Sequence, residues 1–184
     1  MKPKLFDKLT ARLTVLLFLF TAVTAFLLSL VKSVTYKRIE AAEVEKTESA
    51  MRSVLMAESY TPVEYTGGDP NVVNIYKAGD EGYVVECNVS GSQGMIGMVV
   101  GVDNSATVTG IGITSSSETS GLGANASAAT EVGVNFREQF VGTAGDLAVK
   151  TDGGTIDALT GATVTSRAVT SGVNSAVAAV RELG

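Results

Sequence analysis

The chain has 184 residues, of which 45% are apolar, with one cysteine, no histidine and no tryptophan. The missing histidine excludes a Ser-His-Asp triad and any histidine-ligated metal or haem, and one cysteine cannot hold an iron–sulfur cluster, so redox chemistry here needs an organic cofactor. Residues 32–184 contain 10 basic and 18 acidic residues, a net charge of −8, which disfavours nucleic-acid binding.

The first strong feature is an uncharged apolar run at residues 13–31, after a short stub at residues 1–12. As a helix this run spans roughly 28 Å, close to the hydrocarbon thickness of a bilayer. It is longer than the apolar region of a signal peptide, and no good cleavage site follows it, so we predict a retained transmembrane helix. Basic residues favour a cytoplasmic N-terminus and an extracytoplasmic main domain. They are Lys2, Lys4, Lys8 and Arg12 before the run, and Lys32, Lys37 and Arg38 after it.

Residues 32–66 are predicted to form a connecting helix, to about residue 58, and a linker. Breakers at Thr61-Pro62 and at residues 66–70 place the start of the main domain at residue 67. Strands are predicted at residues 71–78, 82–90, 94–102 and 106–114, and the short turns between them indicate an antiparallel sheet. Cys87 lies on an alternating apolar face of the second strand, which predicts a small buried residue rather than a redox centre.

The remaining segments are predicted to be mostly loop and helix. Residues 115–124 form a packed loop, and residues 126–141 form a helix with Val132, Phe136 and Phe140 on its inner face. A short strand at 147–150 leads to a turn at 152–154 and to a closing helix at 164–183. The inner positions of that helix are Val169, Val173, Ala176, Val177 and Val180. The fold class is therefore α+β: an antiparallel sheet packed with helices, preceded by one transmembrane helix.

The segment Thr160-Gly161-Ala162-Thr163 lies just before the closing helix. Gly161 allows a tight turn, and Thr165 or Ser166 is suited to cap the helix. A phosphate on the Thr163 hydroxyl would face the free N–H groups and the positive dipole end of the helix. Arg167 would add a charge-assisted contact or face water. Taken alone, the four residues are better explained as an ordinary turn with a helix cap, because short motifs recur by chance.

The longer string Asp157–Thr163 resembles the flavinylation motif of the FMN-binding domain family, in which an Asp precedes Gly-Ala-Thr and a hydroxyl residue, here Thr160, stands before the Gly. The resemblance implies FMN joined through its phosphate to Thr163, in a turn formed by Gly161 and Ala162. It also implies a separate flavin transferase that uses FAD and magnesium, and for which Asp157 is part of the recognised signature.

A second string, residues 118–123, is similar to the Glu-Thr-Pro-Gly-Leu-Gly loop of the same family, with Ser120 in place of the Pro. The resemblance implies that this loop contacts the cofactor, with glycine backbone near a flat ring and Leu122 packed on its face. Because Ser120 lacks the fixed φ of proline, the stiffness of the loop is the part that differs. The implied cofactor-binding residues of this loop are Glu118, Thr119, Gly121, Leu122 and Gly123.

With the apolar run and the chain length, these motifs make the chain similar to the G subunits of Rnf electron-transport complexes. That resemblance implies an electron-relay subunit, not catalytic alone, on the outer face of the cell membrane. Its partners would be the other membrane subunits of a ferredoxin:NAD oxidoreductase coupled to Na⁺ or H⁺ movement. The alternatives are a C-subunit-like component of a sodium-pumping NADH:quinone reductase, a solitary flavoprotein reductase, and a pilin-like surface protein. No metal site and no catalytic residue is predicted.

Overall fold

The N-terminal part of the chain is one long helix, α1, at Lys8–Val54. The computed structural model describes residues 8–183, without the side chains of residues 8, 9, 34 and 37–44. The chain divides into two compact units, Met1–Glu45 and Lys46–Gly184. Of the basic residues that predicted the orientation, Lys2, Lys4, Lys8, Lys37 and Arg38 lie outside the described side chains.

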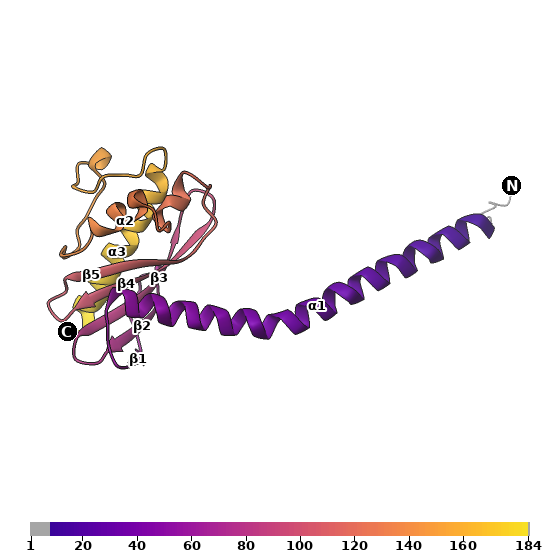
Figure 1. The fold of residues 1–184 in the computed structure, drawn as a ribbon, viewed down its shortest axis with the longest axis horizontal. Helices are drawn as coiled ribbons and strands as arrows, with labels where there is room; N and C mark the ends of the chain where they lie inside the picture. Colours follow the sequence, from indigo (N-terminus) through magenta and orange to yellow (C-terminus); the bar gives the residue numbers. More distant parts are fainter. Residues whose placement is uncertain (1–7, 184) are drawn as a thin grey trace. The chain divides into compact units, whose positions relative to one another are not determined.

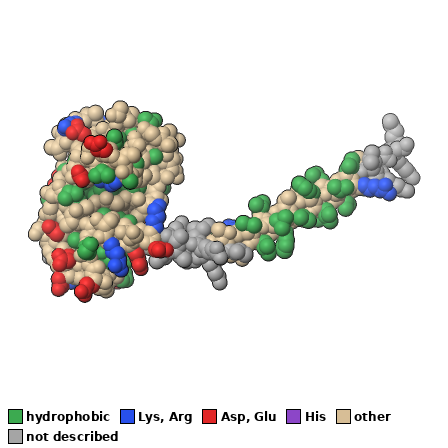
Figure 2. Space-filling model, in the orientation of Figure 1, with side chains coloured by type: hydrophobic (Ala, Val, Ile, Leu, Met, Phe, Trp, Pro, Cys, Tyr) green, Lys and Arg blue, Asp and Glu red, His purple; other side chains and the backbone are tan. Residues whose placement is uncertain are grey.

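Within the first unit, the stretch Thr10–Ser33 has a mean hydropathy of 2.5, and none of it is buried. By length and composition it is suited to cross a membrane, and its apolar side chains are visible along the helix in Figure 2. It contains the predicted run at 13–31. Water-exposed apolar side chains over this length are costly for a soluble helix, which is consistent with a membrane-anchored protein.

The second unit is built on one antiparallel sheet with the order β1-β2-β3-β4-β5 (Figure 1). Its strands are β1 (Tyr60–Val63), β2 (Val72–Ala78), β3 (Gly82–Ser90), β4 (Met95–Asp103) and β5 (Val108–Ser116). The four predicted strands are confirmed within two residues at each end. Strand β1 was not predicted, because Pro62 is a strand breaker in isolation. Proline is tolerated at a sheet edge, and here β1 is the edge strand paired only with β2.

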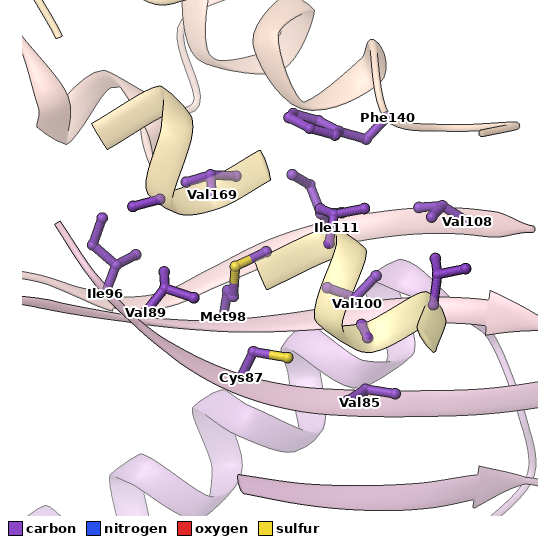
Figure 3. Packing of buried hydrophobic residues seen from close by; sticks show 14 of the residues in the cluster. Val85, Cys87, Val89, Ile96, Met98, Val100, Val108, Ile111, Phe140 and Val169 are labelled. Carbon is purple, nitrogen blue, oxygen red and sulfur yellow. The ribbon is translucent and has the colours of Figure 1, made fainter. Parts of the chain in front are cut away.

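The main core lies between one face of the sheet and helix α3 (Thr163–Leu183). Figure 3 shows strand residues such as Val89, Met98 and Val100 on the same side of the sheet as Val169. All five inner positions predicted for the closing helix are buried, with Val169 and Val173 fully inaccessible. The α+β fold class is therefore confirmed, because alternation along the strands and helical spacing in α3 bury matching apolar faces.

Cys87 lies inside this core, with no exposed surface. Burial raises the pKa of its thiol to about 12, and the thiol donates to the Gly172 carbonyl oxygen at 3.6 Å. A thiol held protonated in this way is a poor nucleophile and a poor metal ligand. The interpretation of Cys87 as a small core residue is confirmed.

The opposite face of the sheet is covered by the last turns of α1. Met51 and Val54 are buried there against Val84 and Val99. Gly101 and Gly110 pair across β4 and β5, and a Cβ on Gly101 would lie 2.6 Å from the Val54 carbonyl oxygen. These glycines therefore let the helix end approach the strands closely.

Side chains from the sheet also cap the end of α1. Thr109 Oγ1 donates to the Val54 carbonyl oxygen at 2.7 Å, and the Tyr60 hydroxyl donates to the Leu55 carbonyl oxygen at 2.6 Å. Carbonyl groups in the last turn of a helix have no partner within the helix, so these bonds satisfy them. The last turns of α1 are thus an integral part of the second unit.

Three local predictions are wrong. The helix predicted at 126–141 is shorter: a 3-10 turn η1 (Gly123–Ala126) is followed by α2 (Glu131–Glu138). Gly133, in the first turn of α2, packs against the Ala128 carbonyl oxygen, which would lie 2.4 Å from a Cβ at this position. Phe136 and Phe140 are buried as predicted, but Val132 is 56% exposed. The strand predicted at 147–150 is a single bridge from Val149 to Ile156, followed by the 3-10 turn η2 (Lys150–Asp152).

Candidate functional site

Helix α3 begins at Thr163, which is half-buried. The predicted caps Thr165 and Ser166 are wrong, because the helix starts earlier than expected and both hydroxyls form other bonds. Ser166 Oγ accepts from the Leu159 N–H at 2.9 Å and donates to the Ala162 carbonyl oxygen at 2.9 Å. This buried serine fixes the segment before the helix to its first turn. The first N–H groups of α3 have no partner within the helix and are therefore available to an anion.

The loop 118–123 lies next to this segment. The Thr119 carbonyl oxygen accepts from the N–H of Leu122 at 3.1 Å, which closes a turn around Gly121 with φ of 78°. Leu122 is 43% exposed, and its Cδ2 lies 3.0 Å from the position that a Cβ on Gly161 would take. The two sequence motifs therefore meet at Leu122 and Gly161, and the φ of 71° at Gly161 also favours glycine.

Glu118 is buried behind this contact, with 8% of its surface exposed. Its Oε1 accepts from the Gln93 N–H at 2.8 Å, and its Oε2 accepts a hydrogen bond from Thr165 Oγ1. Hydrogen bonds from the backbone at Gln93 and from Thr165 outweigh the effect of burial, and the pKa of the Glu118 carboxyl is lowered. One carboxylate thus joins the β3–β4 turn, the 118–123 loop and helix α3.

An open pocket of about 390 Å³ lies between these three segments. This volume is in the range of about 300–1,000 Å³ that small-molecule sites commonly have. The pocket is lined by Ser92, Gln93, Glu118, Thr119, Leu122, Gly123, Gly161, Ala162, Thr163, Val164 and Thr165. Seven of the ten predicted cofactor-binding residues are in this lining, and Ser92, Gln93, Val164 and Thr165 are additional. No motif in the sequence indicated that residues 92–93 belong to the site, because this turn reaches the pocket only through the pairing of β3 with β4.

The other three predicted residues lie elsewhere. Gly121 is at the tip of its loop, with no atom within 4 Å of the position of a Cβ. Asp157 and Thr160 line a second, more open pocket together with residues of α2, including Val132, and the adjoining Gln139. The predicted motif 157–163 therefore has two faces, one toward each pocket.

Asp157 is held by its backbone rather than by its carboxylate. Its N–H donates to Gln139 Oε1 at 2.7 Å, and Gln139 Nε2 donates to its carbonyl oxygen at 3.2 Å. The carboxylate, 66% exposed, pairs with Lys150 at 2.7 Å. This arrangement fixes the main chain of the motif and leaves an acidic side chain accessible at the surface.

Arg167 forms a bidentate pair with Asp152, with both N–O distances 2.6 Å. This ion pair was not among the two alternatives from the sequence, which were a contact to a phosphate at Thr163 and a side chain in water. The guanidinium lowers the pKa of the Asp152 carboxyl. Neither residue lines the first pocket, so Glu118 is the only ionisable residue among the eleven lining residues, all of which the structure describes.

Gly123, the second glycine of the 118–123 loop, packs against the hydrogen bond between Glu118 and Thr165. A Cβ on Gly123 would lie 2.5 Å from both Glu118 Oε2 and Thr165 Oγ1. We expect Gly123→Ala to destabilise the second unit by about 1–3 kcal/mol, because the buried contact has no room for a methyl group. Denaturant unfolding checks this value. Gly68→Ala, where no atom lies within 4 Å, is the matched control and should change stability little. Equal stability of the two variants would contradict this packing.

Residues 91–178 match the FMN-binding domain family, and this range contains every residue that lines the first pocket. The chain is 34% identical over 182 residues to the G subunit of the ion-translocating oxidoreductase complex of Methanosarcina acetivorans, covering 93% of this chain and 94% of that protein. It is 32% identical over 196 residues to the G subunit of the Na(+)-translocating ferredoxin:NAD(+) oxidoreductase complex of Acetobacterium woodii, covering 96% of this chain and 94% of that protein.

Proposed function

The chain belongs to the FMN-binding domain family and is related over nearly its full length to G subunits of ion-translocating oxidoreductase complexes, and we propose that it is the FMN-carrying electron-relay subunit of such a complex. The observation that carries this proposal is the convergence of both predicted motifs on one pocket within the matched range. When bound, FMN supplies reversible transfer of one or two electrons.

The residues of the pocket fit a phosphorylated, flat aromatic group. Thr163 presents a half-buried hydroxyl at the start of a 21-residue helix, where the N–H groups of the first turn and the helix dipole favour a phosphoryl group. Leu122 and Val164 are 43% and 51% exposed in the lining and offer apolar surface to a ring. The chain's own role is to hold and orient the cofactor and to set the charge around it.

The attachment we propose is a phosphoester to Thr163. The Thr163 hydroxyl oxygen forms a bond to the flavin phosphorus and gives up its proton, while the pyrophosphate bond of FAD breaks and AMP leaves. A separate flavin transferase with magnesium would perform this reaction. A covalent tether prevents loss of the cofactor by dilution, which suits a domain on the extracytoplasmic side of the membrane.

The stretch Thr10–Ser33 is proposed to anchor the chain as a single span with its N-terminus in the cytoplasm. The partners would be the other membrane subunits of a complex that passes electrons between ferredoxin and NAD and moves Na⁺ or H⁺. The family match favours this function over a pilin-like surface protein. Near-complete coverage of the two G subunits favours it over a C-subunit-like component of a quinone reductase.

The test is to produce the full chain together with a flavin transferase and to purify it in detergent. We expect one FMN per chain by absorbance, reversible bleaching on reduction, and a fluorescent band after denaturing electrophoresis. A colourless protein with an intact fold would contradict the proposal.

Asp157→Ala should lower the fraction of chains that carry flavin several-fold, because it removes the exposed carboxylate of the proposed transferase signature. The fold should be retained, since Gln139 holds residue 157 through its main chain. The measurement is in-gel fluorescence per protein. Lys150→Ala breaks the same ion pair and keeps the carboxylate, so it is the matched control and should load normally. Equal loading of both variants would remove Asp157 from the signature.

A further inference from the structure

Glu118 places a charge in the wall of the pocket. It is buried, and it is the only ionisable residue among the eleven described residues that line this pocket. The charged pairs near the motif, Arg167 with Asp152 and Lys150 with Asp157, are each internally neutralised and lie outside this lining. The electrostatic character of the pocket wall therefore depends mainly on one carboxylate.

The hydrogen bonds of Glu118 keep this carboxylate charged. Its oxygens accept from the Gln93 N–H and the Thr165 hydroxyl, and backbone contacts at Ser92 and Gly94 also stabilise the anion. The pKa of the carboxyl is lowered despite its burial. Glu118 is therefore poorly suited to give a proton to a ligand at neutral pH, and its negative charge is permanent there.

Its place in the fold explains how a charge is accommodated. A Cβ on Gly91 would lie 2.5 Å from Glu118 Oε1, and a Cβ on Gly123 would lie 2.5 Å from Oε2. Two glycines thus make room for the carboxylate, and donors from two other segments hold it. A neutral side chain of the same shape would keep the packing but lose the charge.

We propose that the fixed negative charge of Glu118 in the pocket wall makes reduction of the bound flavin less favourable. This inference rests on the proposed function. Adding electrons increases the negative charge of a group in the pocket, and a nearby carboxylate in a partly desolvated wall opposes that increase. The partial positive charge at the start of α3 acts chiefly on the phosphoryl group at Thr163. Glu118 therefore shifts the midpoint potential to a more negative value.

The test is a redox titration of flavin-loaded full-length protein in detergent at neutral pH. In Glu118→Gln we expect the reduced-to-oxidised ratio at a fixed potential to rise about tenfold, which corresponds to about 30 mV for a two-electron couple. Glu86→Gln removes a carboxylate that pairs with Asn74 on the other face of β3, and should leave the potential unchanged. An unchanged potential in a loaded Glu118→Gln protein would overturn the proposal.

A second pair of variants tests the charge without disturbing the buried contact. Gln93 is exposed and lines the pocket, so its side chain is replaceable without a core change. Gln93→Lys should raise the potential and Gln93→Glu should lower it. If Glu118→Gln fails to take up flavin, the two Gln93 variants decide the question. The inference would be overturned if their midpoint potentials did not shift in opposite directions. Wild-type protein without any flavin would instead overturn the proposed function, and the inference with it.

The hydrogen-bonded charge of Glu118 has its own readout in flavin-free protein. The pKa of Glu118 is lower in the folded protein than in the unfolded chain. Its charge therefore contributes fully to stability above the pKa of the unfolded chain, and this contribution is lost as the pH falls through the pKa of the folded protein. Wild type should therefore lose stability more steeply than Glu118→Gln below about pH 4.5, the ordinary pKa of a glutamate. Parallel acid profiles of the two proteins would contradict the proposed hydrogen-bonded charge.

Discussion

Replacing Thr163 by alanine is expected to remove essentially all flavin that survives denaturation. The proposed phosphoester needs a hydroxyl at this position, and alanine has none. The Thr163 hydroxyl lies at the first residue of α3, at the surface of the pocket, so the helix and the thermal stability should be preserved. The measurement is fluorescence of the protein band after denaturing electrophoresis, with circular dichroism to confirm folding.

Two variants serve as controls for this result. Thr163→Ser keeps a hydroxyl at the same position and should retain part of the loading. Thr160→Ala removes a hydroxyl three residues earlier, on the face toward the second pocket, and should leave the covalent bond intact. Its loading, measured in parallel with that of Asp157→Ala, reports any effect on recognition by the transferase. Fluorescence retained in Thr163→Ala would show that the attachment site is elsewhere.

A fragment that begins at residue 67 is expected to fold poorly, whereas one that begins at residue 46 should fold. The shorter fragment lacks β1 and the end of α1, which leaves Val84 and Val99 uncovered. Losing the buried Met51 and Val54 side chains alone costs about 3–6 kcal/mol, at about 1.5–3 kcal/mol each. That is a large part of the roughly 5–15 kcal/mol that stabilises an ordinary domain.

The comparison uses solubility, circular dichroism and thermal unfolding of the two fragments. The fragment from residue 46 retains the hydrogen bonds from Thr109 and Tyr60 to the end of α1. A cooperative transition at the same temperature for both fragments would show that the domain begins at residue 67, as the sequence breakers indicate. A lost transition in the shorter fragment would place the boundary near residue 46.

Local sequence patterns predicted much of the fold because they report burial directly. Val- and Ile-rich stretches between short turns identified β3 and β4, and alternation in 82–90 identified the inner position of Cys87. Helical spacing identified the five inner residues of α3. The run at 13–31 indicated the apolar stretch of α1. Each of these signals depends on residues close together in the chain, so no long-range contact is needed to read it.

The resemblance of two strings in the sequence to the FMN-binding domain family selected the pocket motifs, but the tertiary structure decided how they are arranged. Thr165 and Glu118 are 47 residues apart, and their hydrogen bond exists only because α3 packs beside the 118–123 loop. The same packing makes Thr165 a partner of Glu118 rather than a helix cap. Asp157 lines the second pocket instead, where Gln139 holds its main chain. Strand β1 likewise depends on pairing with β2. Chain-local periodicity indicated most of the buried residues, although Val132 is exposed. The partners of the buried residues are set by contacts that form only in the folded domain.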